Sequence, residues 1–556
     1  MVEHVEAQVL ILLLIAALVG MAARRLRVPY TLALVVAGLV LGFVHLDALH
    51  GVALQPQILL LLLLPALLFE AAFHVDVHEF RRNIVPILTL AVPGVLVAVS
   101  ATAGLLYVSL GLSGLVPSFG LDHAFLFAAV ISATDPVSVL ALFRTLGVDK
   151  RLYLLVEGES LLNDGVAVVV FFIVAAVLGI DIGHGGEAHA VHGTAEIVSM
   201  AIKQFAWMAG VGTLTGLAIG GAVSALTKQI DDHLVEVTLT TIVAYGSFLV
   251  AEQLHASGVL STVAAGIVMG SLGRNYGMSV STRVAVEDFW EYAAFLANSF
   301  VFLLVGLELD AGTMSTYAPA IAVAFAMVCI GRATAVYGLI PIANRFAEPI
   351  PLAWRHVMWW GGLRGSLSMV LIITLPEAFP GRDVLVALVF GIVAISLFLQ
   401  GLTVGPFMTR LGLLTGDTET KRDYELARGR AMSAHEAIGH AEELAHRGLI
   451  SPAAHSRLRS WYERRRDEAQ TNAEKLAAGT QHPEQVLEGL KMLVDVERDT
   501  LREAAHHGVL APDVVQQLTA ETHARMVALS EAAHHGDEAL AKAVQELIGE
   551  VDSPKE

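Results

Sequence analysis

Long apolar runs recur between the amino terminus and residue 411, and they constrain the fold more than any other feature. A helix needs roughly 20 mainly apolar residues to cross a bilayer, and by this measure the sequence predicts about thirteen transmembrane helices. They lie near residues 7–23, 29–46, 57–75, 83–111, 121–147, 151–180, 197–226, 235–255, 257–272, 284–308, 317–346, 351–378 and 383–411. Of the 556 residues, 55% are hydrophobic and only 16% are charged. Water-soluble proteins contain a larger share of charged residues. The sequence therefore predicts an all-α polytopic membrane protein.

The loops between these spans indicate how the chain is oriented. Arginines follow the first apolar run, VLILLLIAALVGM, whereas a cleaved signal peptide carries its charge before the apolar segment, so we expect this run to remain as span 1. Basic residues also follow spans 3, 5 and 7, and the loops on the other side, Arg382 apart, are nearly free of them. Cytoplasmic loops carry the excess of Lys and Arg. We therefore expect a multi-pass protein of the cell membrane with its amino terminus outside and its carboxyl terminus in the cytoplasm.

Several classes of function find no support in the sequence. The formal charge is −18 and no basic patch is visible, so a nucleic-acid partner is not expected. The single cysteine, Cys329, rules out an intramolecular disulfide. There is no nucleophile–base arrangement, phosphate loop or Cys/His cluster, so we expect neither an enzyme nor a bound cofactor.

Two predicted spans are interrupted at corresponding positions. Span 5 is broken at Asp135-Pro136, and span 12 at Gly361, Gly362 and Arg364 in the sequence GGLRGS. Proline removes a backbone donor and clashes with the preceding turn. Transporters built from inverted repeats place such discontinuous helices at the membrane midplane. We therefore expect two inverted six-helix repeats, spans 1–6 and 8–13, with broken crossing helices 5 and 12.

The composition changes abruptly after Leu414 to a charged segment rich in alanine and histidine. We expect a transmembrane domain over residues 1–411 and a helical cytoplasmic tail, a candidate regulatory segment, over residues 412–556. In the tail, segments beginning at His446 and His506 each pair a glycine that can end a helix with a proline that can begin the next. The sequence therefore predicts two helical hairpins there.

Charged residues inside the apolar segments mark the candidate site. Carboxylates at membrane depth each cost roughly 3 kcal/mol or more, so they need partners or a function. Asp135 lies in the middle of span 5, and Glu159 and Asp164 lie in span 6. On a helix, residues three and four apart share one face, so span 6 presents one polar stripe made of Glu159, Ser160, Asn163 and Asp164.

The two spans together predict a site built of oxygen atoms. Pro136 frees the backbone carbonyl of Ser132, and irregular backbone at membrane depth occurs only where it is buried in protein or lines a wet cavity. Carbonyl, hydroxyl and carboxylate oxygens suit a hard cation rather than zinc or copper. The side chains expected to contribute are Asp135, Asp164, Thr134 and Ser160.

The sequences ISATDPVSVLALF and LLVEGESLLNDGVAVVVF resemble the fifth and sixth helices of the monovalent cation:proton antiporters, in the branch of bacterial sodium/proton antiporters and animal sodium/hydrogen exchangers. The resemblance covers residues 1–411, with ATDP, GESLLND and GGLRG in the family's order and spacing. It implies that Asp164 binds cation and proton in competition and that Asn163 stabilises the crossing of the broken helices. It also implies a cation shell of Asp135, Thr134 and Ser160.

The resemblance implies three further features. Glu70, near the end of span 3, corresponds to an acidic residue near the cation site. Glu159 and Arg332 correspond to an ion pair, for which we expect a structural role. Arg364 has two open interpretations, as part of the ion path or as the charge that neutralises half-helix dipoles. The family also implies a homodimer in the lipid bilayer.

The expected function is secondary active transport. A monovalent cation, Na⁺ first and Li⁺ as an alternative, would exchange for H⁺ by alternating access, as spans 3–6 and 10–13 move past a dimerisation domain. Because Asn163 is uncharged, Asp164 is the single titrating carboxylate, and it would exchange one cation for one proton. We therefore expect electroneutral exchange. K⁺/H⁺ exchange stays open, since the sequence does not set the size of the site, and a cation channel or a membrane-embedded sensor is a further alternative.

Overall fold

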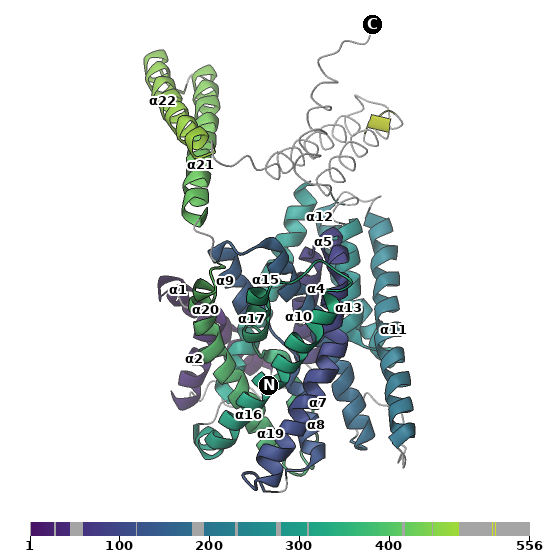
Figure 1. Cartoon of the computed structure of the whole chain (residues 1–556). Helices are drawn as coiled ribbons and strands as arrows, with labels where there is room; N and C mark the ends of the chain where they lie inside the picture. Colours follow the sequence, from purple (N-terminus) through teal and green to yellow (C-terminus); the bar gives the residue numbers. More distant parts are fainter. Residues whose placement is uncertain are drawn as a thin grey trace. The chain divides into compact units, whose positions relative to one another are not determined.

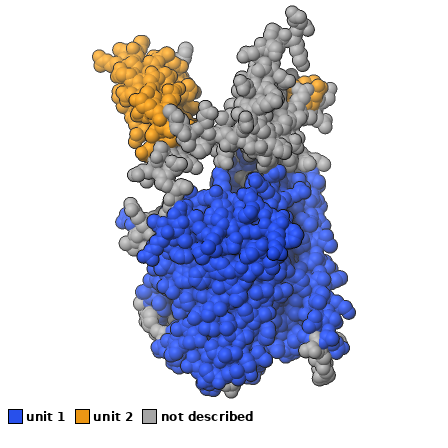
Figure 2. Space-filling model, in the orientation of Figure 1, with its two compact units in different colours: residues 1–414 blue, residues 415–556 orange. Residues whose placement is uncertain are grey.

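The computed structural model describes residues 2–26, 29–44, 59–117, 119–180, 194–227, 232–273, 278, 280–308, 311–413, 417–447, 449–477, 514 and 517–518. These residues form helices and their links, with no strand among them (Figure 1). The chain divides into two compact units, Met1–Leu414 and Thr415–Glu556, which Figure 2 colours separately. The prediction of an all-α fold is confirmed.

Every predicted span contains a helix or a broken pair of helices close to the predicted residues. From the amino terminus these are α1 (Val2–Leu26), α2 (Tyr30–Val44), η2 (Leu59–Leu63), α4 (Leu64–His74), α6 (Ile84–Thr89), η3 (Leu90–Gly94), α7 (Val95–Leu106), η4 (Tyr107–Leu112), α8 (Leu121–Ile131), α9 (Val137–Leu146) and α10 (Lys150–Val177). They continue with α11 (Thr194–Thr227), α12 (His233–Gln253), α13 (Gly258–Val268), η5 (Met269–Gly273), α15 (Val280–Glu308), α16 (Ala311–Ala343), α17 (Leu352–Trp360), α18 (Ser366–Ile373), α19 (Arg382–Ile395), η6 (Ser396–Gln400) and α20 (Gly401–Arg410). Within the described residues, seven continuous helical segments are long and apolar enough to cross a membrane, and shorter apolar helices accompany them.

Two local features were not predicted from the sequence. The η segments are single π-helical turns inside or at the ends of longer helices, such as η3, which contains Pro93. A short helix, α5 (Val77–Arg82), also precedes α6. It begins at Asp76, whose carboxylate accepts the backbone N–H groups of His78 and Glu79 at 2.9 and 3.2 Å, as a helix N-cap does. The capped helix α5 thus forms part of the link between spans 3 and 4.

The transmembrane helices pack as two groups. We name α6–α10 and α16–α20, which include both broken helices, the crossing group, and α1, α2, α4, α11–α13 and α15 the flanking group. The sequence placed spans 3 and 10 with the crossing helices, but the structure packs α4 against α13 and α15, and α15 against α2. The reason is close backbone approach: a Cβ atom at Gly38 of α2 would lie 2.1 Å from the Leu303 carbonyl oxygen of α15. Small residues allow such contacts between membrane helices.

The second unit begins with a helical hairpin. α21 (Asp417–His446) packs against α22 (Pro452–Ala477), and Arg459 of α22 contacts the Glu442 carboxylate of α21 at 3.0 Å. Pro452 is the first residue of α22, where its missing N–H costs no helical hydrogen bond. The first predicted hairpin is therefore present, and the second, from His506, lies outside the described residues.

Candidate functional site

The two helix breaks meet within the crossing group. The first separates α8, which ends at Ile131, from α9, which begins at Val137, and the second separates α17 from α18 across residues 361–365. The backbone N–H of Asp135 donates to the carbonyl oxygen of Leu363 at 2.9 Å. The two irregular segments, which carry Pro136 and the GGLRG sequence, are therefore hydrogen-bonded directly to each other.

The Arg364 side chain lies at the carboxyl end of the half-helix α8. The Arg364 guanidinium donates through Nη1 to the carbonyl oxygens of Ser132 and Ala133, at 2.9 and 3.3 Å. Those carbonyls follow the last turn of α8, where the helix dipole is negative. Arg364 is only 5% exposed and lies outside the wall of the cavity described below. Of the two interpretations left open by the sequence, the geometry favours the neutralised dipole.

Asn163 and Ser160 fasten α10 to the first break. The side-chain amide of Asn163 donates to the carbonyl oxygen of Ser132 at 3.1 Å and to the hydroxyl of Thr134 at 2.9 Å. The hydroxyl oxygens of Ser160 and Thr134 lie 3.1 Å apart, and Ser160 also donates to the Thr134 carbonyl. All these side chains are buried. This arrangement agrees with a role for Asn163 in holding the crossing together.

A cavity of about 860 Å³ lies between the crossing and flanking groups and reaches this crossing. Asp135, Asp164, Thr134 and Ser160 form part of its wall, and Glu70 of α4 lies on the same wall. Asp164 lies one residue after Asn163, whose amide contacts Ser132 and Thr134 at the first break. The structure therefore brings the predicted cation-binding side chains to one cavity, with Asn163 and Pro136 directly beside them.

The described part of the cavity wall is acidic. It carries the carboxylates of Glu70, Asp135, Glu157, Asp164 and Glu291, and no lysine or arginine among the described residues. The imidazole of His74 lies 3.4 Å from the Glu70 carboxylate. A cavity lined by one sign of charge concentrates ions of the opposite sign. This site is therefore suited to attracting cations to the crossing.

Glu159 and Arg332 form a separate buried ion pair. Two nitrogens of the Arg332 guanidinium donate to the two oxygens of Glu159, both at 2.7 Å, and Nη2 also donates to the Met358 carbonyl at 3.2 Å. The pair joins α10 to α16 and to the end of α17, and neither residue lines the acidic cavity. Gly362 passes close to it, since a Cβ atom there would lie 3.1 Å from Arg332 Nε.

The donor set at this site consists of hydroxyl and carboxylate oxygens, which suit a hard cation. Among the described residues, no group of three or more His, Cys, Asp and Glu side chains could hold a metal ion. Hydroxyl and carboxylate oxygens next to irregular backbone can instead replace the water shell of an alkali cation. A charged carboxylate without a basic partner is costly in such surroundings. Asp164 and Asp135 are therefore placed to take up either a cation or a proton.

Sequence reasoning missed part of the wall. Glu291 and Asn298 of α15 and Tyr30 of α2 line the cavity from the flanking group. No local pattern distinguishes them from other residues of their helices, and only the packing of α15 against α2 brings them to the cavity. Gly365 was noticed only as part of a helix break, although it also lines the cavity beside Asp135.

Replacing Gly365 by alanine will impair the site. The added Cβ atom would lie 2.3 Å from the Cβ atom of Asp135, so one of the two broken segments must move. Overpacking of this kind costs about 1–3 kcal/mol. We expect lower transport and a lower thermal midpoint in detergent. Gly338→Ala is the control, because its Cβ atom would meet nothing within 4 Å, and equal behaviour of the two variants would contradict the prediction.

Taken together, a multi-pass helical fold and two broken helices that cross beside carboxylates define a membrane transporter of ions. Residues 10–410 match the family described as sodium/hydrogen exchanger, transmembrane, and the chain belongs to this family. The resemblance inferred from the motifs is thereby confirmed.

Similar proteins extend over most of the chain. The Na⁺/H⁺ antiporter ApNhaP of Aphanothece halophytica is 38% identical over 439 residues, which cover 78% of each chain. The Na⁺/H⁺ antiporter NhaG of Bacillus atrophaeus is 36% identical over 474 residues, 83% of this chain and 85% of that protein. The solved structure of the sodium proton antiporter MjNhaP1 from Methanocaldococcus jannaschii has a TM-score of 0.58 at 16% identity, covering 74% of this chain and 99% of that chain. The last likeness concerns the fold alone.

Proposed function

We propose that this protein exchanges Na⁺ for H⁺ across the cell membrane, one for one, by alternating access. The observation that carries this proposal is the acidic cavity that reaches Asp164 and Asp135 at the crossing of two broken helices. The relatives described as Na⁺/H⁺ antiporters support the choice of ions.

Asp164 would carry the exchanged ion. A carboxylate with no basic partner, set among buried residues, is stable when either a proton or a cation neutralises it. The hydroxyls of Thr134 and Ser160 and the Asp135 carboxylate would complete the coordination of a bound cation. Asn163, which lies beside Asp164, is uncharged, so a single carboxylate changes its occupant. Exchange would then move no net charge.

Alternating access would follow from movement between the two helix groups. The cavity lies at their boundary, with Asp164 on the crossing group and Glu70 and Glu291 on the flanking group. A shift of the crossing group would expose the same site to the other side of the membrane, as in inverted-repeat transporters. The flanking group would form the homodimer contact in the bilayer, with the amino terminus outside and the carboxyl terminus in the cytoplasm.

The test uses purified protein in acid-loaded liposomes that contain a pH-sensitive dye. Adding Na⁺ will cause proton efflux, and adding Li⁺ instead of Na⁺ will cause a smaller efflux. An imposed membrane potential in leak-free vesicles will leave the efflux rate unchanged. No response over a broad pH range would overturn exchange. A response to K⁺ alone would indicate K⁺/H⁺ exchange, cation flux without proton countertransport a channel, and a strong response to potential would overturn electroneutrality.

A further inference from the structure

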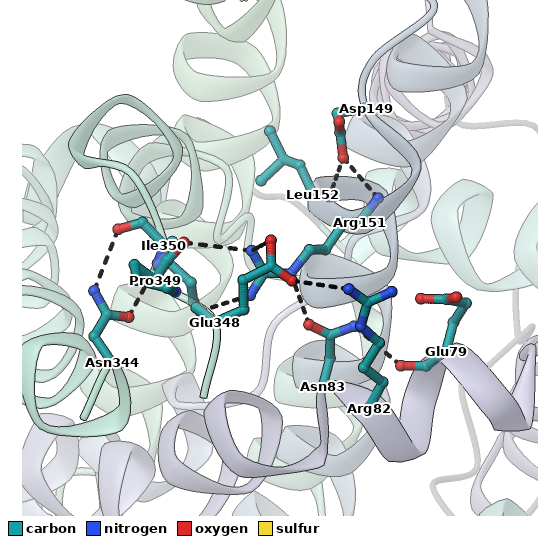
Figure 3. Close-up of polar contacts among 10 residues, drawn as sticks. All are labelled: Glu79, Arg82, Asn83, Asp149, Arg151, Leu152, Asn344, Glu348, Pro349 and Ile350. Atoms are coloured by element: carbon teal, nitrogen blue, oxygen red, sulfur yellow. Dashed lines mark hydrogen bonds and ion pairs between the residues drawn. The ribbon is translucent and has the colours of Figure 1, made fainter. Parts of the chain in front are cut away.

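Arg151, the second residue of α10, joins three segments that are distant in the sequence, as Figure 3 shows. Its Nε donates to the side-chain oxygen of Asn83 at 2.8 Å, at the junction of α5 and α6. Its Nη2 and Nη1 donate to the backbone carbonyls of Glu348 and Pro349, at 2.7 and 3.4 Å, in the link between α16 and α17. We name Asn83, Arg151, Glu348 and Pro349 the Arg151 cluster.

The bond to Asn83 is the buried part of this cluster, and the two bonds to the Glu348 and Pro349 carbonyls lie at the surface. The Arg151 side chain is 14% exposed and lies 5.7 Å from the ring centroid of Trp354, and Asn83 is buried. Arg151 also contacts the Glu348 carboxylate at 3.3 Å, but that side chain is 53% exposed. An exposed ion pair contributes little, whereas a buried acceptor such as the Asn83 side-chain oxygen is costly to leave without a donor. The flat guanidinium, with its five N–H donors, can bond to both partner segments at once, and a lysine lacks this geometry.

These contacts lie at the beginnings of α6, α10 and α17, of which α10 and α17 lead to the candidate site. Asn83 directly precedes α6, and Arg151 lies at the start of α10, which carries Asp164. The link at residues 344–351 leads into α17, which ends at the second break, where Leu363 accepts the Asp135 backbone N–H. A shift of α10 relative to α17 would therefore move Asp164 relative to the crossing.

We propose that Arg151 is a positioning residue for the cation site, which fixes the start of α10 relative to the broken helix α17 while ions bind. The proposal rests on the Na⁺/H⁺ exchange proposed above. Without these bonds, part of the protein molecules would have α10 shifted relative to α17, with Asp164 displaced from the crossing. Apparent affinity falls with the fraction of protein in the competent arrangement, so the KM for Na⁺ would rise more than the maximal rate falls.

Arg82 provides a matched control for Arg151. It is also an arginine at this face of the protein and contacts the same Glu348 carboxylate at 3.3 Å (Figure 3). Its side chain is 55% exposed, however, and Glu348 is the partner that the structure gives it. Replacing Arg82 removes the same kind of charge without releasing the three segments.

The experiment compares Arg151→Gln, Arg151→Lys, Asn83→Ala and Arg82→Gln with wild type in the full-length protein. Na⁺-driven proton efflux from proteoliposomes gives the KM and the maximal rate per correctly inserted molecule, and the thermal midpoint is measured in detergent. We expect both Arg151 variants to raise the KM roughly tenfold, because a set of charge-assisted hydrogen bonds is lost. Asn83→Ala will raise it less, and Arg82→Gln will stay within about twofold, as an exposed pair predicts.

Three results would overturn the proposal. A wild-type KM in Arg151→Lys would mean that charge alone matters. A lower KM in Arg151→Gln would mean that the arginine acts by repelling cations. Lower stability and maximal rate at an unchanged KM would leave a structural role only, and the Asn83→Ala result decides the same question if Arg151→Gln does not insert. Absence of any Na⁺ response in wild type would instead refute the proposed exchange, and this inference with it.

Discussion

Asp164→Asn protein will insert and fold as wild type does, and its Na⁺-driven proton efflux will fall to the level of protein-free liposomes. Asparagine keeps the shape of the side chain and can still accept hydrogen bonds through its amide oxygen. It cannot bind and release a proton, so no ion can be exchanged against one. Dye-reported efflux, corrected for the amount of inserted protein, measures the effect.

Glu291→Gln is the matched control for that prediction. Glu291 is an exposed carboxylate on the wall of the same cavity, but it belongs to α15 of the flanking group. If it only helps attract cations, its loss changes the rate by about threefold at low ionic strength and less in high salt. Transport that survives in Asp164→Asn, or is lost in Glu291→Gln, would contradict the assignment of the exchanging carboxylate.

The helices and both breaks could be predicted because their signals are local. Apolar runs of sufficient length predict helices in a bilayer whatever their neighbours are. Pro136 and the glycines around Leu363 interrupt helices through their own backbone chemistry. The polar stripe of α10 likewise follows from helical spacing alone. The candidate carboxylates therefore stood out before any packing was known.

Packing between distant segments could not be predicted in the same way. The sequence set α4 and α15 with the crossing helices, whereas the structure packs α4 against α13 and α15, and α15 against α2. The close backbone approach of Gly38 to α15 belongs to this packing, and no local pattern indicates it. The sequence marked Arg151 only as one of the basic residues in a loop. In the structure it bonds to Asn83, which lies 68 positions away in the chain, and to Glu348, which lies 197 positions away. The pairing of Glu159 with Arg332 came from the family resemblance, not from any local pattern.

That ion pair yields the other large effect that we expect. Glu159→Gln will lower the thermal midpoint strongly and abolish transport, because the Arg332 guanidinium remains charged and buried without its carboxylate. Breaking a buried pair on one side costs about 3–5 kcal/mol, whereas removing both charges together is often close to neutral. The double variant Glu159→Gln, Arg332→Gln should therefore regain most of the stability that the single variant loses.

Transport by the double variant separates a structural role from a role in the ion cycle. Glu159 and Arg332 do not line the acidic cavity, and their bonds hold α10 against α16 and the end of α17. If the pair only supports this packing, Na⁺-driven proton efflux will return together with the thermal midpoint. A stable double variant that stays inactive would show that Glu159 takes part in ion exchange, and a double variant as unstable as Glu159→Gln would refute the argument from uncompensated charge.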